Sequence, residues 1–163
     1  MDGATVETRR FRRLVWLMPP AFVLHIAEEY IGGFPSWVTH VLGGAFDNFA
    51  FAANNAAFMA IMLALTAWTS RTGSRLATFL LIAWASGNLF WDALFHILTT
   101  AALNRYSPGL VTASLLYIPI SLLIGWSALK SQALGLAALS AAIAAGAALL
   151  GLVIWYGLFH FAL

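Results

Sequence analysis

The chain has 163 residues, of which 62% are apolar and 9% charged, with a formal charge of +2 at pH 7 and a mean hydropathy of +0.87. This composition excludes an ordinary soluble domain, and the small net charge argues against a nucleic-acid partner. Cysteine is absent, which excludes disulfides and thiolate chemistry. We therefore expect an all-α, polytopic transmembrane helical bundle that forms one domain over residues 1–163.

Five apolar segments follow a basic leader at residues 1–13 and predict five membrane spans. The segments cover about 14–31, 45–69, 76–102, 109–129 and 133–162. Sequences rich in Gly, Pro, Ser and Asn separate them and indicate turns. Pro19 and Pro20 interrupt the first segment, so we expect a kinked span that is kept and not a cleaved signal peptide.

Basic residues are concentrated on one side of these predicted spans. Seven of the eight lie in the leader or in the second and fourth connections, and only Arg105 lies in the third connection. The positive-inside rule then places the N-terminus in the cytoplasm and the C-terminus outside.

The end of the first segment places a histidine and two glutamates in an apolar run. His25, Glu28 and Glu29 project from one helix face, because successive residues turn by about 100°. An ionised side chain deep in a membrane costs roughly 2.5–3.5 kcal/mol, which favours a functional site here. The alternative is an interfacial cap whose glutamates extend toward water.

Polar residues also recur at helical spacing in the second segment (Asp47, Asn54, Asn55) and the third (Asn88, Asp92, His96). Counted along each helix from the nearest cytoplasmic arginine, seven polar groups lie at ~18–25 Å, in the outer half of the membrane: His25, Glu28, Glu29, Asn54, Asn55, Asn88 and Asp92. Three alternatives remain: Asp47 as a helix cap, the asparagines as interhelical hydrogen bonds, and an Asp92–His96 bond that joins helices.

A substrate pocket is predicted beside this polar level. Asn54, Asn55 and Asn88 are predicted to bind substrate, together with the aromatic residues that flank the third stripe: Trp84, Phe90, Trp91 and Phe95. Such a pocket suits a hydrophobic small molecule or a membrane lipid. We expect the connection at 32–44 to cover the site from outside.

The last segment is predicted to be scaffold, because Ala138, Ala142 and Gly146 form a small-residue face that permits close helix packing. His40 and His160 are expected to lie outside the site.

The buried carboxylates need compensation, yet every Lys and Arg lies at a membrane boundary. Protonation, a wet cavity or a bound cation could supply it. A cation uses all the polar groups at once, so we predict a divalent metal, namely Zn, Mn or Fe, held by His25, Glu28, Glu29, Asp92 and His96. Glu28, Glu29, Asp92 and His96 are the predicted catalytic residues.

The motif His25-x-x-Glu28-Glu29, followed by Asn88-x-x-x-Asp92-x-x-x-His96 and then "YSPG" at 106–109, resembles the HXXEE-domain family of small bacterial integral membrane proteins. The likeness extends to about residue 129. It implies location in the bacterial cytoplasmic (inner) membrane and an active site at His25, Glu28, Glu29 and His96. It supplies no reaction.

Two classes of function follow. The first is a membrane-embedded enzyme acting on a lipid or isoprenoid-like substrate, either metal-dependent or a metal-free general-acid isomerase or cyclase. The second is a proton- or cation-coupled transporter or ion-binding protein. No inverted repeat supports transport, and a bundle this small would need to form a homo-oligomer. Nucleophilic catalysis by Ser86, Ser107 or Ser114 is the weakest option.

Overall fold

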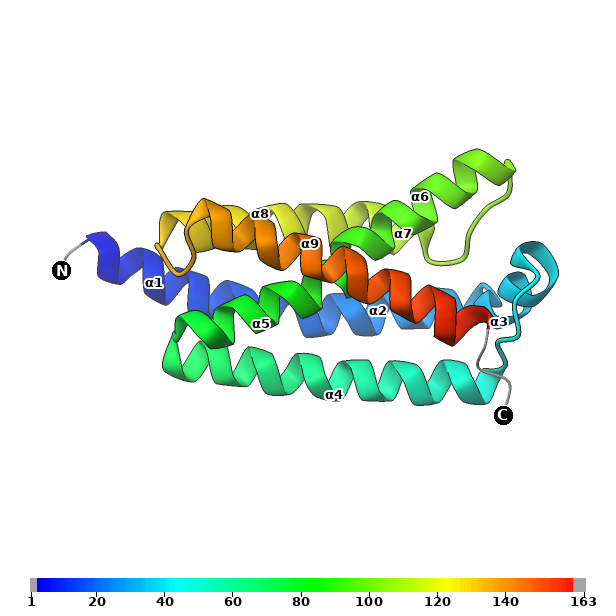
Figure 1. Cartoon of the computed structure of the whole chain (residues 1–163), viewed down its shortest axis with the longest axis horizontal. Helices are drawn as coiled ribbons and strands as arrows, with labels where there is room; N and C mark the ends of the chain where they lie inside the picture. The colour runs from blue at the N-terminus through cyan, green and yellow to red at the C-terminus, as the bar shows by residue number, and fades with distance from the viewer. Residues whose placement is uncertain (1–2, 160–163) are drawn as a thin grey trace.

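The computed structural model describes residues 3–159, and all regular secondary structure in that range is helical. The all-α class is confirmed. Long helices run side by side along one axis, and the first helix and the end of the last described helix lie at opposite ends of the bundle (Figure 1).

Most helices continue through a change of hydrogen-bonding pattern without a break. The first comprises α1 (Gly3–Leu14), η1 (Val15–Leu17) and α2 (Met18–Ile31); a short helix follows as α3 (Phe34–Trp37) and η2 (Val38–Leu42). Next come α4 (Asn48–Thr72) and a helix made of α5 (Arg75–Ala85), η3 (Ser86–Trp91) and α6 (Asp92–Leu103). The last two are α7 (Leu110–Thr112), η4 (Ala113–Tyr117) and α8 (Ile118–Lys130), and then α9 (Leu136–Leu152) with η5 (Val153–Leu158).

Four of the described helices are long and apolar enough to cross a membrane: Asn48–Thr72, Arg75–Leu103, Leu110–Lys130 and Leu136–Leu158. They correspond to predicted segments two to five. Large apolar side chains such as Ile31 and Leu115 are 85% and 68% exposed, as expected where the surroundings are hydrocarbon. These features identify an integral membrane protein. The first predicted span is not among the four, so a count of five stays a prediction.

The first helix joins the arginine-rich leader to the segment that carries the HIAEE sequence. Pro19 and Pro20 lie in the first turn of α2, after a 3₁₀ turn, and the helix continues through them. Arg12 donates from Nε and Nη2 to the carbonyls of Ser70 and Arg71, which are among the last carbonyls of α4. The leader is therefore packed into the bundle and caps another helix.

The helix Arg75–Leu103 is the most buried of the four long helices. It packs against α9 where Gly87 meets Gly146: a Cβ on Gly87 would lie 2.9 Å from the Gly146 carbonyl oxygen. Ala142 and Gly146 are buried in this contact, which confirms the predicted small-residue packing face. Close packing of α9 holds the centre of this helix inside the bundle, one turn before Asp92.

Candidate metal centre

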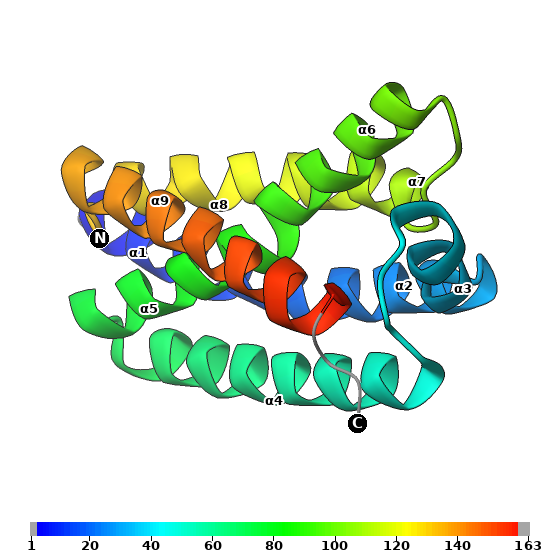
Figure 2. The same cartoon turned by 45° about the vertical axis from the view of Figure 1, so that its right-hand side comes forward.

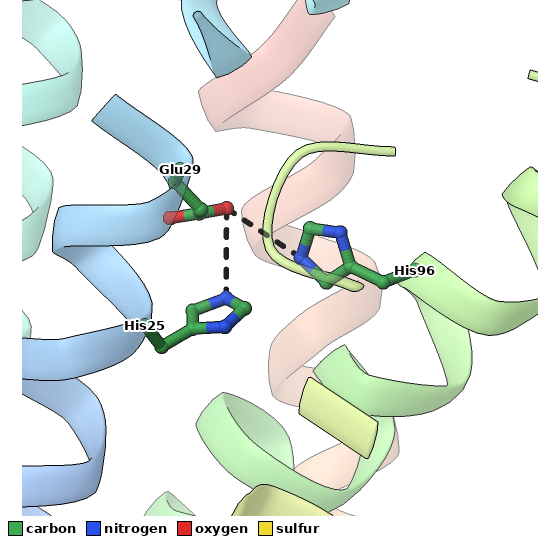
Figure 3. A group of neighbouring side chains, drawn as sticks. All are labelled: His25, Glu29 and His96. Atoms are coloured by element: carbon green, nitrogen blue, oxygen red, sulfur yellow. Dashed lines mark ion pairs between the residues drawn. The ribbon is translucent and has the colours of Figure 1, made fainter. Parts of the chain in front are cut away.

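Four polar side chains from two helices converge inside the bundle. His25 and Glu29 come from α2, and Asp92 and His96 come from α6. His25, Glu29 and His96 are 2%, 6% and 0% exposed, and each offers a ligand atom within 4.8 Å of the others. Figure 3 shows one Glu29 oxygen directed at the imidazoles of both histidines.

The distances within this group match those expected around a small metal ion. His25 Nε2 lies 3.1 Å from Asp92 Oδ2 and 3.7 Å from Glu29 Oε1. His96 Nε2 lies 3.6 Å and 3.5 Å from the same two oxygens. Tetrahedral ligands at 2.0–2.1 Å from an ion lie about 3.4 Å from one another. The four side chains thus have suitable spacing to share one divalent cation.

The outer nitrogen of each imidazole is hydrogen-bonded to a hydroxyl. His25 Nδ1 lies 2.9 Å from Thr112 Oγ1, and His96 Nδ1 lies 2.8 Å from Ser107 Oγ. Both Nε2 atoms are buried, and within residues 3–159 neither has a hydrogen-bond partner. Metal-bound histidines usually have this arrangement, in which the second ring nitrogen is fixed by a neighbouring group.

Glu28 is turned away from the group and binds the segment before α8. Its Oε1 accepts from the Tyr106 hydroxyl at 2.5 Å and from Val111 N at 3.1 Å. Its Oε2 accepts from Thr112 N at 2.7 Å and Thr112 Oγ1 at 2.5 Å. A carboxylate has about four lone-pair sites, so these donors saturate it. The structure does not bring Glu28 to the predicted ligand cluster.

Glu28 nevertheless acts on His25 through Thr112. The Thr112 hydroxyl has a single proton, and the ionised Glu28 carboxylate can only accept it. The hydroxyl oxygen must then accept from His25 Nδ1–H. This order fixes the tautomer of His25 and leaves the lone pair of Nε2 directed into the group. Glu29 therefore faces the two imidazoles directly, while Glu28 orients one of them through Thr112.

The backbone at Gly109 closes the group on one side. Gly109 has a φ of +104°, and a Cβ there would lie 2.7 Å from His25 Cε1 and 2.8 Å from His96 Cε1. Only glycine fits here, because it tolerates the positive φ and has no Cβ that would collide with the two rings. The "YSPG" sequence thus supplies the Ser107 hydrogen bond and a backbone surface against the imidazoles.

A cavity of about 70 Å³ lies beside the group and is lined by His25, Glu29 and Asp92. Asn54, Asn55, Asn88 and Phe95, which are predicted substrate-binding residues, also line it. Trp84 and Trp91 do not line this cavity; their indole nitrogens donate to the carbonyls of Phe58 at 3.3 Å and Ile143 at 2.8 Å. Phe90 lines a separate groove.

The remaining predicted residues have structural roles or lie elsewhere. Asp47 is the N-cap of α4 and accepts from Ala50 N at 2.7 Å, which is the capping alternative. The connection at 32–44 is largely helical and covers the site, with the Phe34 ring 5.6 Å from that of His96. His40 bonds the Ser36 carbonyl on the exposed side of this cover, and His160 lies outside the described residues.

Sequence reasoning missed two residues that contact the group, Thr112 and Tyr117, and considered a third, Ser107, only as a nucleophile. Thr112 and Ser107 orient the imidazoles, and Ser107 is fully buried, which does not suit a nucleophile. Tyr117 packs its ring 4.4 Å from that of His25, and its buried hydroxyl has no partner within the described chain. The sequence did offer one signal for Tyr117, since it is the single tyrosine of an otherwise apolar predicted span.

A family described as "Protein of unknown function with HXXEE motif" matches residues 16–124. The chain belongs to this HXXEE family. The motif that names the family is His25, Glu28 and Glu29, and the match also includes Asp92 and His96. Searches of the curated proteins and of the solved structures found no match.

Proposed function

We propose that this HXXEE protein is a membrane-embedded, metal-dependent enzyme that acts on a lipid or isoprenoid-like molecule. One observation carries the proposal: two carboxylates and two imidazole Nε2 atoms converge within 3.1–3.7 Å at a buried point. In the described part of the chain, no Lys or Arg pairs with Glu29 or Asp92. A divalent cation would offset both negative charges, whereas two unpaired carboxylates at this depth cost several kcal/mol.

The donor set favours Zn, Mn or Fe, because imidazole with carboxylate suits these ions better than Mg or Ca. A divalent ion held here would supply Lewis-acid polarisation of a substrate carbonyl or phosphoryl oxygen. His25, Glu29 and His96 are the proposed ligands. Asp92 lines the cavity and contacts both imidazoles, so it is placed either to complete the ligand set or to exchange a proton with substrate.

Metal content tests the first half of the proposal. Protein purified in mild detergent without chelator should contain close to one divalent ion per chain by elemental analysis. Glu29→Gln and His96→Ala should each remove most of it, while His40→Ala, on the exposed cover, should not. Chelation should lower the melting temperature of the parent but not of Glu29→Gln, because a ligand at about 1,000 times its Kd adds about 4 kcal/mol of stability.

Product analysis tests the second half. The reconstituted parent and Glu29→Gln are incubated with membrane lipids and with isoprenoid phosphates, and the products are identified by mass spectrometry. Products made only by the parent support the enzyme. A parent that binds metal but alters none of these molecules supports the ion-binding or transport alternative. A parent that stays metal-free after supplementation and ignores chelator contradicts metal dependence and favours the general-acid enzyme.

A further inference from the structure

An apolar groove of about 510 Å³ runs between α2 and α4 on the outside of the bundle. Small side chains leave space for it, because three alanines line it, namely Ala27 on α2 and Ala52 and Ala56 on α4. Among the described residues that line it, only Asn55 and Tyr30 are polar. α2 and α4 lie side by side in both views (Figure 1, Figure 2).

This groove adjoins the cavity beside the metal-binding group. Phe51 and Asn55 line both spaces. The Phe51 side chain is 3% exposed, and its ring stacks on that of Tyr30, with centroids 6.1 Å apart. Asn55 Nδ2 donates to the Phe51 carbonyl at 3.0 Å, within their own helix. Two adjacent side chains on α4 therefore form a wall that groove and cavity share.

Two other sides of the cavity are covered by the chain. Phe34 and Phe46 are buried where α3 and the following connection cover the outer end. Gly109 presses its backbone against the two imidazoles. A cavity of about 70 Å³ holds only a few water molecules, so a long hydrocarbon chain cannot fit within it.

We infer that the α2–α4 groove is the lateral entrance for substrate and holds its hydrocarbon chain. The inference rests on the proposed function and narrows the substrate class to long-chain amphiphiles dissolved in the bilayer. The polar end would pass Phe51 and Asn55 to reach the cavity, while the chain stays in the alanine-lined groove. Apolar walls that open toward hydrocarbon suit such a chain and no water-soluble molecule.

The absence of cysteine from the chain permits a direct test of this path. Asn88→Cys puts a single thiol in the cavity and not on the groove. In liposomes, its reaction with dodecyl methanethiosulfonate, which partitions into the bilayer, is compared with that of the impermeant sulfonatoethyl reagent. We expect the dodecyl reagent to react at least tenfold faster.

Adjacent alanines provide the matched control. Ala56→Trp fills the groove, whereas Ala57→Trp adds the same bulk at an exposed position of α4 that does not line it. Ala56→Trp should slow the dodecyl reaction at least tenfold, Ala57→Trp should change it less than twofold, and Phe51→Ala should accelerate it. Equal rates in the two Trp variants, or faster reaction with the impermeant reagent, would overturn the inference that the groove is the substrate entrance.

Labelling does not require a bound metal, so the two proposals fail separately. Elemental analysis of the same samples reports on the metal, and the labelling rates report on the path. Asn54→Cys, also in the cavity and not on the groove, replaces Asn88→Cys if that variant is not folded by circular dichroism.

Discussion

At Gly109 the polypeptide backbone lies directly on the imidazoles of His25 and His96, so this residue tests the geometry of the group. Gly109→Ala adds backbone strain of roughly 1–2 kcal/mol at φ +104° and a methyl within 2.8 Å of both rings. Gly33→Ala is the matched control, because Gly33 has φ +75° but no atom within 4 Å of the added Cβ. We expect both variants to lose stability in thermal unfolding and only Gly109→Ala to lose metal. Equal metal content would show that the rings do not need this backbone contact.

Thr112 permits a test of how the tautomer of His25 is fixed. Thr112→Val keeps the side-chain shape but removes the hydroxyl between Glu28 and His25. Metal affinity should fall about 10- to 100-fold, the usual cost of losing a group that orients a ligand. Thr112→Ser should restore most of it, since the hydroxyl returns. Competition with a metal indicator measures both, and a Ser variant as weak as Val would contradict the role of the hydroxyl.

The sequence identified all four converging residues, but it did not distinguish the role of Glu28 from that of Glu29. Neighbouring residues on a helix point about 100° apart, so each faces a different element: Glu29 faces α6, and Glu28 faces α7. Spacing alone does not reveal which helix lies on which side. Thr112 lies 87 residues after His25, and no local pattern connects them.

At the scale of elements, the Glu28–Tyr106 hydrogen bond ties the connection before α7 to α2. Partial desolvation, this hydrogen bond and the charge of Glu28 raise the pKa of Tyr106 to about 12. Since the unfolded value is about 10, the bond contributes its full stability below pH 10 and loses it as pH rises through 12. Tyrosinate absorbance should show a component near pH 12 that Tyr106→Phe removes and Glu28→Gln moves toward 10. If the absorbance component near pH 12 did not move in Glu28→Gln, the Glu28–Tyr106 hydrogen bond would be contradicted.

The ends of the long helices were predictable because Gly, Ser and Asp mark them. Asp47 and Ser74 cap α4 and α5 through side-chain hydrogen bonds, within three residues of the predicted starts. The π-helical stretch at Ser86–Trp91 was not predictable, since one additional residue per turn has no sequence signature. The short helix at 34–42 was expected only as a covering connection, and its helicity follows from packing of Phe34 and Val38.

For the whole molecule, hydrophobic segments two to five predicted the four long apolar helices but not which of them would be central. Arg75–Leu103 is the most buried of the four, and this depends on Gly87 fitting Gly146, a match between residues 59 positions apart. Local hydropathy contains no information about such long-range pairs. Residues of α2 and α6 meet, while the asparagines of α4 line the adjoining cavity. The depth of these polar groups in the membrane stays a prediction.

Topology is the remaining prediction for the whole molecule, and the first helix decides it. The α4–α5 and α8–α9 connections lie at the end where α1 begins, with most of the basic residues, while α3 and the α6–α7 connection lie at the other end (Figure 2). The helix Gly3–Ile31 is about 43 Å long, enough to cross a bilayer. We expect reporter fusions to place the N-terminus and residues 71–75 in the cytoplasm and residues 33–43 outside.

A four-span arrangement makes a different prediction at one position only. If the first helix lay along the membrane surface, the N-terminus would share a side with residues 33–43, while the order of the other connections would be unchanged. An N-terminal fluorescent protein, which folds only in the cytoplasm, paired with alkaline phosphatase at residue 40, which is active only outside, separates the two arrangements. Replacing Arg9, Arg10 and Arg13 by Gln should weaken the cytoplasmic preference, and Arg12 is left in place because it caps α4. Fluorescence without phosphatase activity, or phosphatase activity without fluorescence, would place both positions on one side of the membrane and contradict five spans.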